Sequence, residues 1–278
     1  MKVVFSTVLN DLYVPGMVAL IKSVKKHNPD FNYEFRIYHS SFTPVWGELS
    51  GESVELLDSL YDHFEFIEPP FKPYLDNGRD CVKYLSIESF NIDADKVIFF
   101  DADMICLDSL KGLIEFETDG IAMVHGKMTN SFYVGVMVIG KRYLNEQTYL
   151  NILKYDDSKS KKYGVDMKLL NEYFLGKIET LPDEYDAVIT EVHTNGGLKI
   201  GSFHDFGGDW KEWERLYYNK RYRKSGTSFP EGLLRDVKIL HYIFSPWTDR
   251  GRDSLTHMKK NGEFFRQLWE EYYTMDIV

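Results

Sequence analysis

The first hundred residues alternate between short apolar runs and longer segments with helical spacing. The apolar runs at residues 2–8, 33–38, 64–67 and 96–100 have the length of strands. Between them, apolar residues recur at helical spacing over 14–27, 45–61 and 81–90. Strands that alternate with helices predict an α/β fold with a central, mostly parallel sheet flanked by helices. Ligands of such sheets bind beyond the carboxyl ends of the strands, where loop 9–13 and Asp101 are expected.

The pattern changes after residue 110. Residues 120–124 and 133–140 predict two strands with no long helix between them, which makes the sheet mixed, and residues 143–155, 166–174 and 262–275 predict helices. Residues 196–230 have little pattern and predict either a functional loop or a small subdomain. Because the sequence contains no repeat or clear linker, we expect one domain over 1–278. Its expected parts are a nucleotide-binding half at 1–110, an acceptor and metal half at 111–260, and a C-terminal helix at 261–278.

Composition disfavours several classes of partner and location. The chain has 278 residues, with 33 Lys and Arg against 43 Asp and Glu, and its net charge of −10 disfavours a nucleic-acid or anionic-membrane surface. Two cysteines, Cys81 and Cys106, cannot form a disulfide framework, so a reducing compartment is favoured. No apolar run approaches the roughly 18 residues of a membrane span. Asp11 interrupts the first apolar run too early for a signal peptide. We therefore expect a cytoplasmic protein without a membrane span, and the sequence leaves a homodimer open.

Two aspartates, Asp101 and Asp103, follow directly after the apolar run at 96–100. That run does not alternate, so it is expected to be buried on both faces. In an extended segment, side chains two residues apart point to the same face, so both carboxylates would meet there. Two like charges at the edge of a core raise a pKa or require a cation. Oxygen ligands suit Mn²⁺ or Mg²⁺, which usually retain waters or substrate phosphates, so the pair predicts a divalent ion and a diphosphate-bearing substrate.

Other motifs for phosphate binding and hydrolysis do not occur. The sequence has no P-loop and no dinucleotide fingerprint after the first strand, so a metal would have to neutralise more of the phosphate charge. It also lacks the G-x-S-x-G of serine hydrolases. His241 ends a short apolar run at 237–240, and its spacing alone favours a structural histidine over a metal ligand. The aromatic and basic stretch at 210–224 includes Glu212 and Glu214, which favours a packed amphipathic helix over a binding surface.

The order of several motifs resembles the family 8 glycosyltransferases, the glycogenin and bacterial galactosyltransferase group, from Lys2 to Trp247. S-T-V-L-N-D-L-Y at 6–13 is similar to the family's first nucleotide loop. K-Y-L-S-I-E-S-F-N-I-D-A-D-K-V-I-F-F-D-A-D at 83–103 is similar to its donor-binding helix and Asp-x-Asp strand. Further along the chain, F-Y-V-G-V resembles F-N-[SA]-G-V, D-M-K-L-L-N resembles D-Q-x-x-L-N, L-P-D-E-Y-D resembles L-P-x-x-Y-N, and H-Y-I-F-S-P-W resembles H-F-x-G-x-x-K-P-W.

The resemblance implies a single GT-A type domain and a retaining hexosyltransferase. Its donor would be a nucleoside diphosphate sugar, most simply UDP-glucose or UDP-galactose, and its cofactor Mn²⁺ or Mg²⁺. The implied metal ligands are Asp101, Asp103 and His241. The implied donor-binding residues are Thr7, Asn10, Tyr13, Lys83, Asp101, Ala102 and Asp103. Asp166 would lie at the reacting sugar. The acceptor is left open among a protein tyrosine, a glycan, a lipid, a small molecule and a modified nucleic acid.

The chain also departs from the family pattern. Tyr133 and Val134 replace an asparagine and a small residue beside the donor sugar, and Met167 replaces a glutamine near the reacting carbon. Ser245 stands where a phosphate-binding lysine is usual, and Arg250 or Arg252 are the candidates to supply that charge. These departures keep two alternatives open. One is a metal-dependent sugar-nucleotide hydrolase or nucleotidyltransferase, and the other is a non-catalytic sugar-nucleotide-binding module.

Overall fold

The computed structural model describes most of the chain. The described residues are 1–41, 48–70, 82–126, 129–158, 166–189, 234, 236–243, 245–249, 251–252, 255 and 260–276. The segment 196–230, where we expect a functional loop or subdomain, lies outside them.

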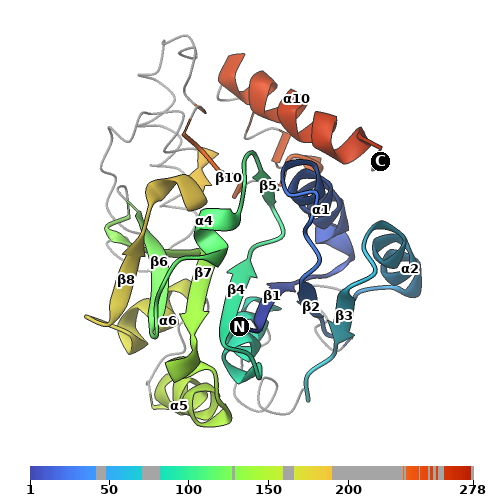
Figure 1. Ribbon diagram of the computed structural model, residues 1–278. Helices are drawn as coiled ribbons and strands as arrows, with labels where there is room; N and C mark the ends of the chain where they lie inside the picture. Colours follow the sequence, from blue (N-terminus) through green and yellow to red (C-terminus); the bar gives the residue numbers. More distant parts are fainter. Residues whose placement is uncertain are drawn as a thin grey trace.

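A seven-stranded sheet forms the centre of the molecule (Figure 1). Its strands, in spatial order, are β3 (Phe64–Ile67), β2 (Glu34–Tyr38), β1 (Val3–Val8), β4 (Lys96–Phe100), β7 (Ser131–Gly140), β6 (Ile121–Gly126) and β8 (Ile178–Leu181). The first four strands are parallel to one another, β7 is antiparallel to both β4 and β6, and β8 is parallel to β6. The expected mostly parallel, mixed sheet is therefore confirmed.

A small second sheet continues from the carboxyl end of β4. It contains β5 (Met104–Cys106), β10 (Ile239–His241) and β9 (Ala187–Val188), with β10 in the middle. β10 runs antiparallel to β5 and parallel to β9, and its last residue, His241, pairs with Met104. This pairing brings a segment from late in the chain beside the two aspartates.

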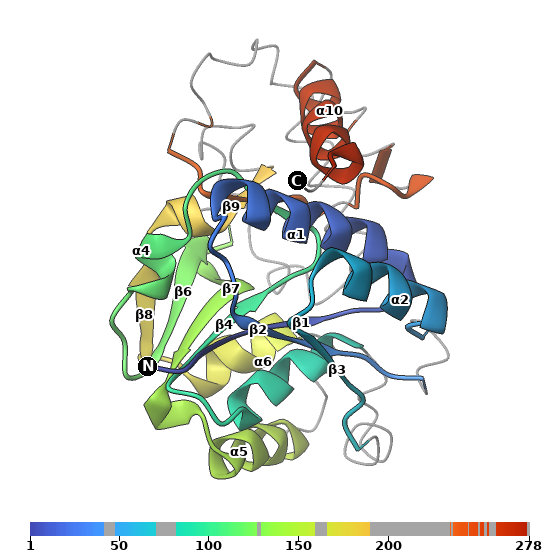
Figure 2. The same ribbon diagram turned by 45° about the vertical axis from the view of Figure 1, so that its right-hand side comes forward.

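Helices cover both faces of the central sheet. α1 (Val14–His27) and α2 (Gly51–Leu60) cover one face, whereas the 3-10 helix η2 (Val82–Asn91), α5 (Glu146–Asp157) and α6 (Asp166–Tyr173) cover the other. α10 (Lys260–Thr274) lies against α1 on the side away from the sheet (Figure 2). Four short elements complete the description: η1 (Asp11–Tyr13), α4 (Lys111–Ile114), η3 (Lys141–Tyr143) and η4 (Asp183–Tyr185). Among the described helices, none has the length and apolar character needed to cross a bilayer.

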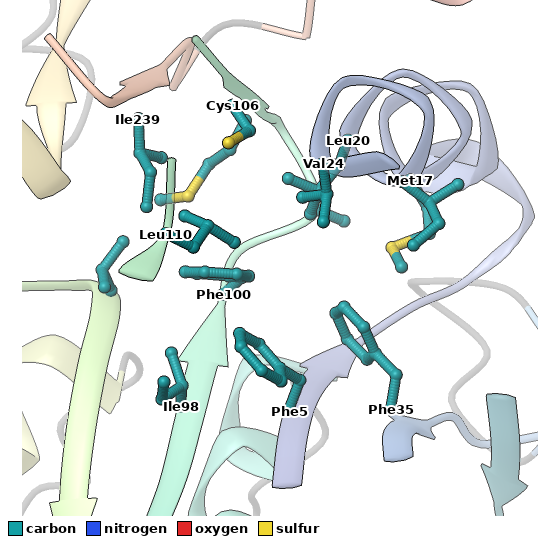
Figure 3. Close-up of a cluster of buried hydrophobic side chains, with 14 of the residues drawn as sticks. Phe5, Met17, Leu20, Val24, Phe35, Ile98, Phe100, Cys106, Leu110 and Ile239 are labelled. Carbon is teal, nitrogen blue, oxygen red and sulfur yellow. The ribbon is translucent and has the colours of Figure 1, made fainter. Parts of the chain in front are cut away.

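The core between α1 and the sheet combines phenylalanine rings with aliphatic and sulfur-containing side chains (Figure 3). Phe5 packs against Phe35 and Phe100, with ring centroids 5.8 and 5.6 Å apart, below Met17 and Val24 of α1. All five residues of β4 are buried, as its non-alternating sequence predicts. A strand that is fixed on both faces holds the residues at its carboxyl end in a defined position.

Some predicted helix boundaries are wrong, and the reason is local capping. The helix expected at 45–61 begins only at Gly51, because the side chain of Ser50 accepts a hydrogen bond from the backbone N–H of Ser53. The helix expected from residue 143 begins at Glu146, because Asn145 caps it in the same way. The helix expected at 81–90 has 3-10 geometry over its described residues.

Candidate metal and donor site

Two carboxylates and one imidazole converge beyond the end of β4. Nε2 of His241 lies 3.3 Å from Oδ1 of Asp103 and 3.7 Å from Oδ2 of Asp101. One ligand atom from each residue lies within 4.8 Å of the other two. The side chains of His241 and Asp103 are only 9% and 11% exposed, whereas that of Asp101 is 38% exposed, so the cluster opens to solvent on the Asp101 side.

The aspartates meet through a bend and not through a continuous strand. Residues 101–103 lie between β4 and β5 and do not have strand geometry. The expectation that an extended segment places both carboxylates on one face is therefore wrong about the backbone. Both carboxylates nevertheless face His241. The backbone holds this bend from two sides: the N–H of Asp101 donates to the carbonyl of Gly135 (2.8 Å), and the N–H of Tyr242 donates to the carbonyl of Asp103 (2.9 Å).

Gly135 of β7 leaves the room that His241 occupies. A Cβ added at this position would lie 2.6 Å from Nδ1 and Cε1 of His241 and from Cε of Met104. Such distances are far shorter than van der Waals contact. The glycine in the F-Y-V-G-V motif therefore permits the close approach of the histidine ring to the backbone of β7.

The second imidazole nitrogen of His241 contacts a buried carboxylate that sequence reasoning missed. Nδ1 lies 2.8 Å from Oδ1 of Asp186, whose Oδ2 accepts a hydrogen bond from the backbone N–H of Val136 (3.1 Å). Asp186 is 1% exposed. Asp186 is the final residue of the L-P-D-E-Y-D motif, so the sequence did mark this position. Its distance along the chain from His241, however, does not predict that the two side chains meet.

The carboxylates govern the charge of this histidine. Burial disfavours the imidazolium, but the negative charges of Asp186 and Asp103 outweigh it and raise the pKa of His241 well above its usual range. A divalent ion can take the place of that proton, because neutral imidazole and carboxylates are established metal ligands.

The donor set fits a divalent cation. Two carboxylates and a neutral imidazole give the three ligands a net charge of −2, which a dication balances, and the buried carboxylate of Asp186 behind His241 adds a further negative charge. Oxygen and imidazole ligands suit Mn²⁺ and other first-row ions, while Mg²⁺ prefers oxygen alone. The solvent-facing side near Asp101 leaves space for ligands from a substrate.

The expected nucleoside loop lies next to this cluster. A Cβ added to Gly16, near the start of α1, would lie 2.4 Å from both the carbonyl oxygen of Ala102 and Cη2 of Trp247. The ring of Trp247 meets Tyr13 edge-on at 6.0 Å, and its indole N–H donates to the carbonyl of Leu12 (2.7 Å). The loop therefore contacts the segment after β10, and Gly16 of α1 lies close to both that segment and the Asp-x-Asp bend.

Asn10 and Thr7 have different environments in this loop. Asn10 is 2% exposed and caps η1, because its Oδ1 accepts from the backbone N–H of Tyr13 (3.2 Å). The hydroxyl of Thr7, at the end of β1, is buried and meets no hydrogen-bond partner among the described residues. A buried hydroxyl without a partner is costly, and because Thr7 is fully buried, its contact with a nucleoside stays a prediction.

Asp166 lies at the start of α6 and is 5% exposed. Its Oδ1 accepts from the backbone N–H of Met167 (2.8 Å), as expected at a helix start. Its Oδ2 accepts from the hydroxyl of Ser86 in η2 (2.8 Å), a contact that the sequence did not suggest. Both carboxylate oxygens are therefore held in place, and a role at the sugar stays a prediction.

The remaining expected residues are placed only in part. Lys83 lies in η2, and its side chain is outside the described part of the chain. Arg252 pairs with Asp249 and donates to the carbonyl of Trp247 (3.2 Å), while Arg250 falls outside the described residues. Val134 is buried, and Tyr133 and Met167 are partly exposed.

Comparison with known proteins agrees with this architecture. The profile named "Glycosyl transferase family 8" matches residues 4–251. The glycosyltransferase GlyF of Streptococcus pneumoniae serotype 4 (strain ATCC BAA-334 / TIGR4) is 23% identical over an alignment of 194 residues that covers 65% of this chain and 48% of GlyF. The chain therefore spans about half the length of that relative.

Two solved structures share the fold. The galactosyltransferase LgtC, solved with donor and acceptor sugar analogues, superposes with a TM-score of 0.62 at 18% identity, covering 99% of this chain and 98% of LgtC. GlyE of Streptococcus pneumoniae TIGR4 superposes with a TM-score of 0.63 at 18% identity, covering 99% of this chain and 61% of GlyE. These neighbours confirm the GT-A fold. The family match over nearly the whole chain shows more: this protein belongs to glycosyltransferase family 8.

Proposed function

We propose that the chain is a metal-dependent retaining hexosyltransferase that uses a nucleoside diphosphate sugar, most simply UDP-glucose or UDP-galactose. The observation that carries the proposal is the partly buried cluster of Asp101, Asp103 and His241, which lies near the start of α1. A bound dication would neutralise the diphosphate as it leaves. Family membership supports glycosyl transfer over the two alternatives.

Different residues of the chain would bind different parts of the donor. Asp101, Asp103 and His241 would hold Mn²⁺ or Mg²⁺, with Ala102 beside them at the bend. Thr7, Asn10 and Tyr13 would bind the nucleoside, and Lys83 would add positive charge near the phosphates or the sugar. Asp166 would orient the sugar hydroxyls and stabilise the positive charge that develops at the anomeric carbon.

The acceptor side is proposed to involve residues 196–230. This segment contains aromatic residues suited to stacking on sugars, namely Trp210, Trp213, Tyr217, Tyr218 and Tyr222. Substitution of Tyr218 or Tyr222 should raise the acceptor KM while the donor KM stays constant. An unchanged acceptor KM would favour a packed amphipathic helix instead.

The test is a panel of nucleotide sugars assayed for release of the nucleoside diphosphate with Mn²⁺, with Mg²⁺ and with EDTA. We expect turnover with a dication, none in EDTA, and a loss of about a hundredfold or more in Asp103→Asn. Asp108→Asn is the matched control, because this exposed aspartate lies five residues further on and the substitution removes the same charge. Full activity in excess EDTA would refute metal dependence. Formation of free sugar 1-phosphate, without transfer, would favour a hydrolase.

A further inference from the structure

The contacts of Asp186 reach both the metal-binding histidine and the strand behind it. Its Oδ1 lies 2.8 Å from Nδ1 of His241, and its Oδ2 accepts from the N–H of Val136 at 3.1 Å. We propose that Asp186 is a positioning residue that fixes the orientation and tautomer of His241, so that Nε2 faces the divalent ion. The inference rests on the proposed metal site.

The two nitrogens of His241 are thereby assigned different partners. Asp186 accepts a hydrogen bond from the N–H at Nδ1, so that in the neutral imidazole, the form that binds a metal, the lone pair of Nε2 faces Asp101 and Asp103. A metal-ligating histidine needs such an outer partner, because a ring that is free to flip or to exchange tautomers presents its lone pair only part of the time. The partner's side chain is fully buried, so water does not compete for the contact.

Asp101, Asp186 and His241 all contact the same short stretch of β7. The carbonyl of Gly135 accepts from the N–H of Asp101, and the N–H of the next residue, Val136, donates to Asp186. Gly135 itself lies against the His241 ring. The histidine and the Asp-x-Asp bend are therefore both fixed to one buried strand, although they are far apart in the sequence.

A carboxylate suits this double contact better than an amide. Each carboxylate oxygen can accept a hydrogen bond, so Asp186 serves the N–H of His241 and the N–H of Val136 together. An asparagine has one oxygen, and its NH₂ group would face one of these two donors.

The test measures Mn²⁺ binding in the absence of any sugar nucleotide, by calorimetry and by the electron paramagnetic resonance signal of free Mn²⁺. Asp186→Ala should raise the Kd for Mn²⁺ by about ten- to a hundredfold, the range for lost outer partners of metal ligands. Asp186→Asn should retain part of the affinity, because its oxygen can still accept from Nδ1. Circular dichroism and melting of the metal-free variants establish that the fold is intact at the binding temperature.

Asp183→Asn is the control, since it removes one negative charge from the neighbouring, exposed start of η4. Its Kd for Mn²⁺ should equal that of the unsubstituted protein. An unchanged Kd in folded Asp186→Ala would overturn the inference, as would an equal loss in Asp183→Asn, because long-range charge would then explain the effect.

The result separates this inference from the proposed function. A protein whose Mn²⁺ affinity depends on Asp186 but which transfers no hexose would overturn only the proposed function. A Mn²⁺-dependent transferase whose Kd for Mn²⁺ is the same with and without Asp186 would overturn only the positioning role. A protein that binds no Mn²⁺ at all would overturn both.

Discussion

The indole N–H of Trp247 donates a 2.7 Å hydrogen bond to the backbone carbonyl of Leu12. This bond ties the segment after β10 to the loop proposed to bind the nucleoside. On its other side, the ring of Trp247 packs against Trp269 of α10, with centroids 5.4 Å apart. Trp247 thus connects the loop with the C-terminal helix.

Trp247→Phe should weaken the binding of a nucleoside diphosphate and destabilise the fold. The lost hydrogen bond alone accounts for about 1 kcal/mol of unfolding free energy. Trp269→Phe is the matched control, because the Nε1 of Trp269 is buried and meets no hydrogen-bond partner among the described residues. Calorimetric titration and urea unfolding measure the two effects. Equal losses of ligand affinity in both variants would argue against a specific role for the Trp247 bond.

Gly135→Ala should disturb the metal site directly. The new methyl group would lie 2.6 Å from the His241 ring and from the end of Met104, so both side chains must move. We expect a loss of roughly 1–3 kcal/mol in stability from overpacking and a fall of about tenfold or more in Mn²⁺ affinity.

The control for Gly135→Ala is Gly51→Ala, where an added Cβ meets nothing within 4 Å at the start of α2. Its stability should change by less than about 1 kcal/mol, and its Mn²⁺ affinity should stay constant. Normal Mn²⁺ affinity in Gly135→Ala would show that His241 can move without losing the ion, or that it is no ligand.

Asp166→Asn should lower kcat by about a hundredfold or more, with little change in donor affinity, as expected of a contact that strengthens in the transition state. Ser86→Ala, which removes the hydroxyl that donates to Oδ2 of Asp166, should lower kcat less. Steady-state kinetics and donor titrations distinguish these effects. A normal kcat with a lower melting temperature would assign Asp166 to the helix start alone.

His27 should make the docking of α10 on α1 sensitive to acid. Its Nε2 lies 2.8 Å from the hydroxyl of Tyr272. Burial, and secondarily the charge of Lys26, lower the pKa of His27 below its usual 6.5, with Asp108 partly opposing the shift. The unfolded chain therefore binds the proton more readily, so this group costs stability as the pH falls through 6.5 and through the lower folded-state pKa.

His27→Gln should consequently flatten the pH dependence of the melting temperature as the pH falls below 6.5. Tyr272→Phe retains the ring against His27 and removes only the hydroxyl, so it reports on the hydrogen bond by itself. If the melting temperature of His27→Gln depends on pH in the same way as that of the unsubstituted protein, the histidine does not govern the acid response.

The central sheet could be predicted from the sequence because its determinants are local. Burial on both faces requires the continuous apolar run of β4, and crossover helices require the apolar spacing seen in α1. Helix starts were less predictable. Ser50 and Asn145 set them through single side-chain contacts that compete with continued helical periodicity.

The apolar pattern of the chain predicted the layered α/β fold and marked Asp101 and Asp103 as a place where charge needed a partner. The spacing of residues did not identify that partner: His241 was implied by the family resemblance alone, and Asp186 was not predicted at all. His241 reaches the aspartates because β10 pairs with β5, Asp186 lies behind it, and Gly135 leaves room for the ring. Contacts between residues so distant in the chain depend on strand pairing and on the space between backbones. Neither leaves a periodic signal in the sequence, because each is a property of two segments together and not of either one alone.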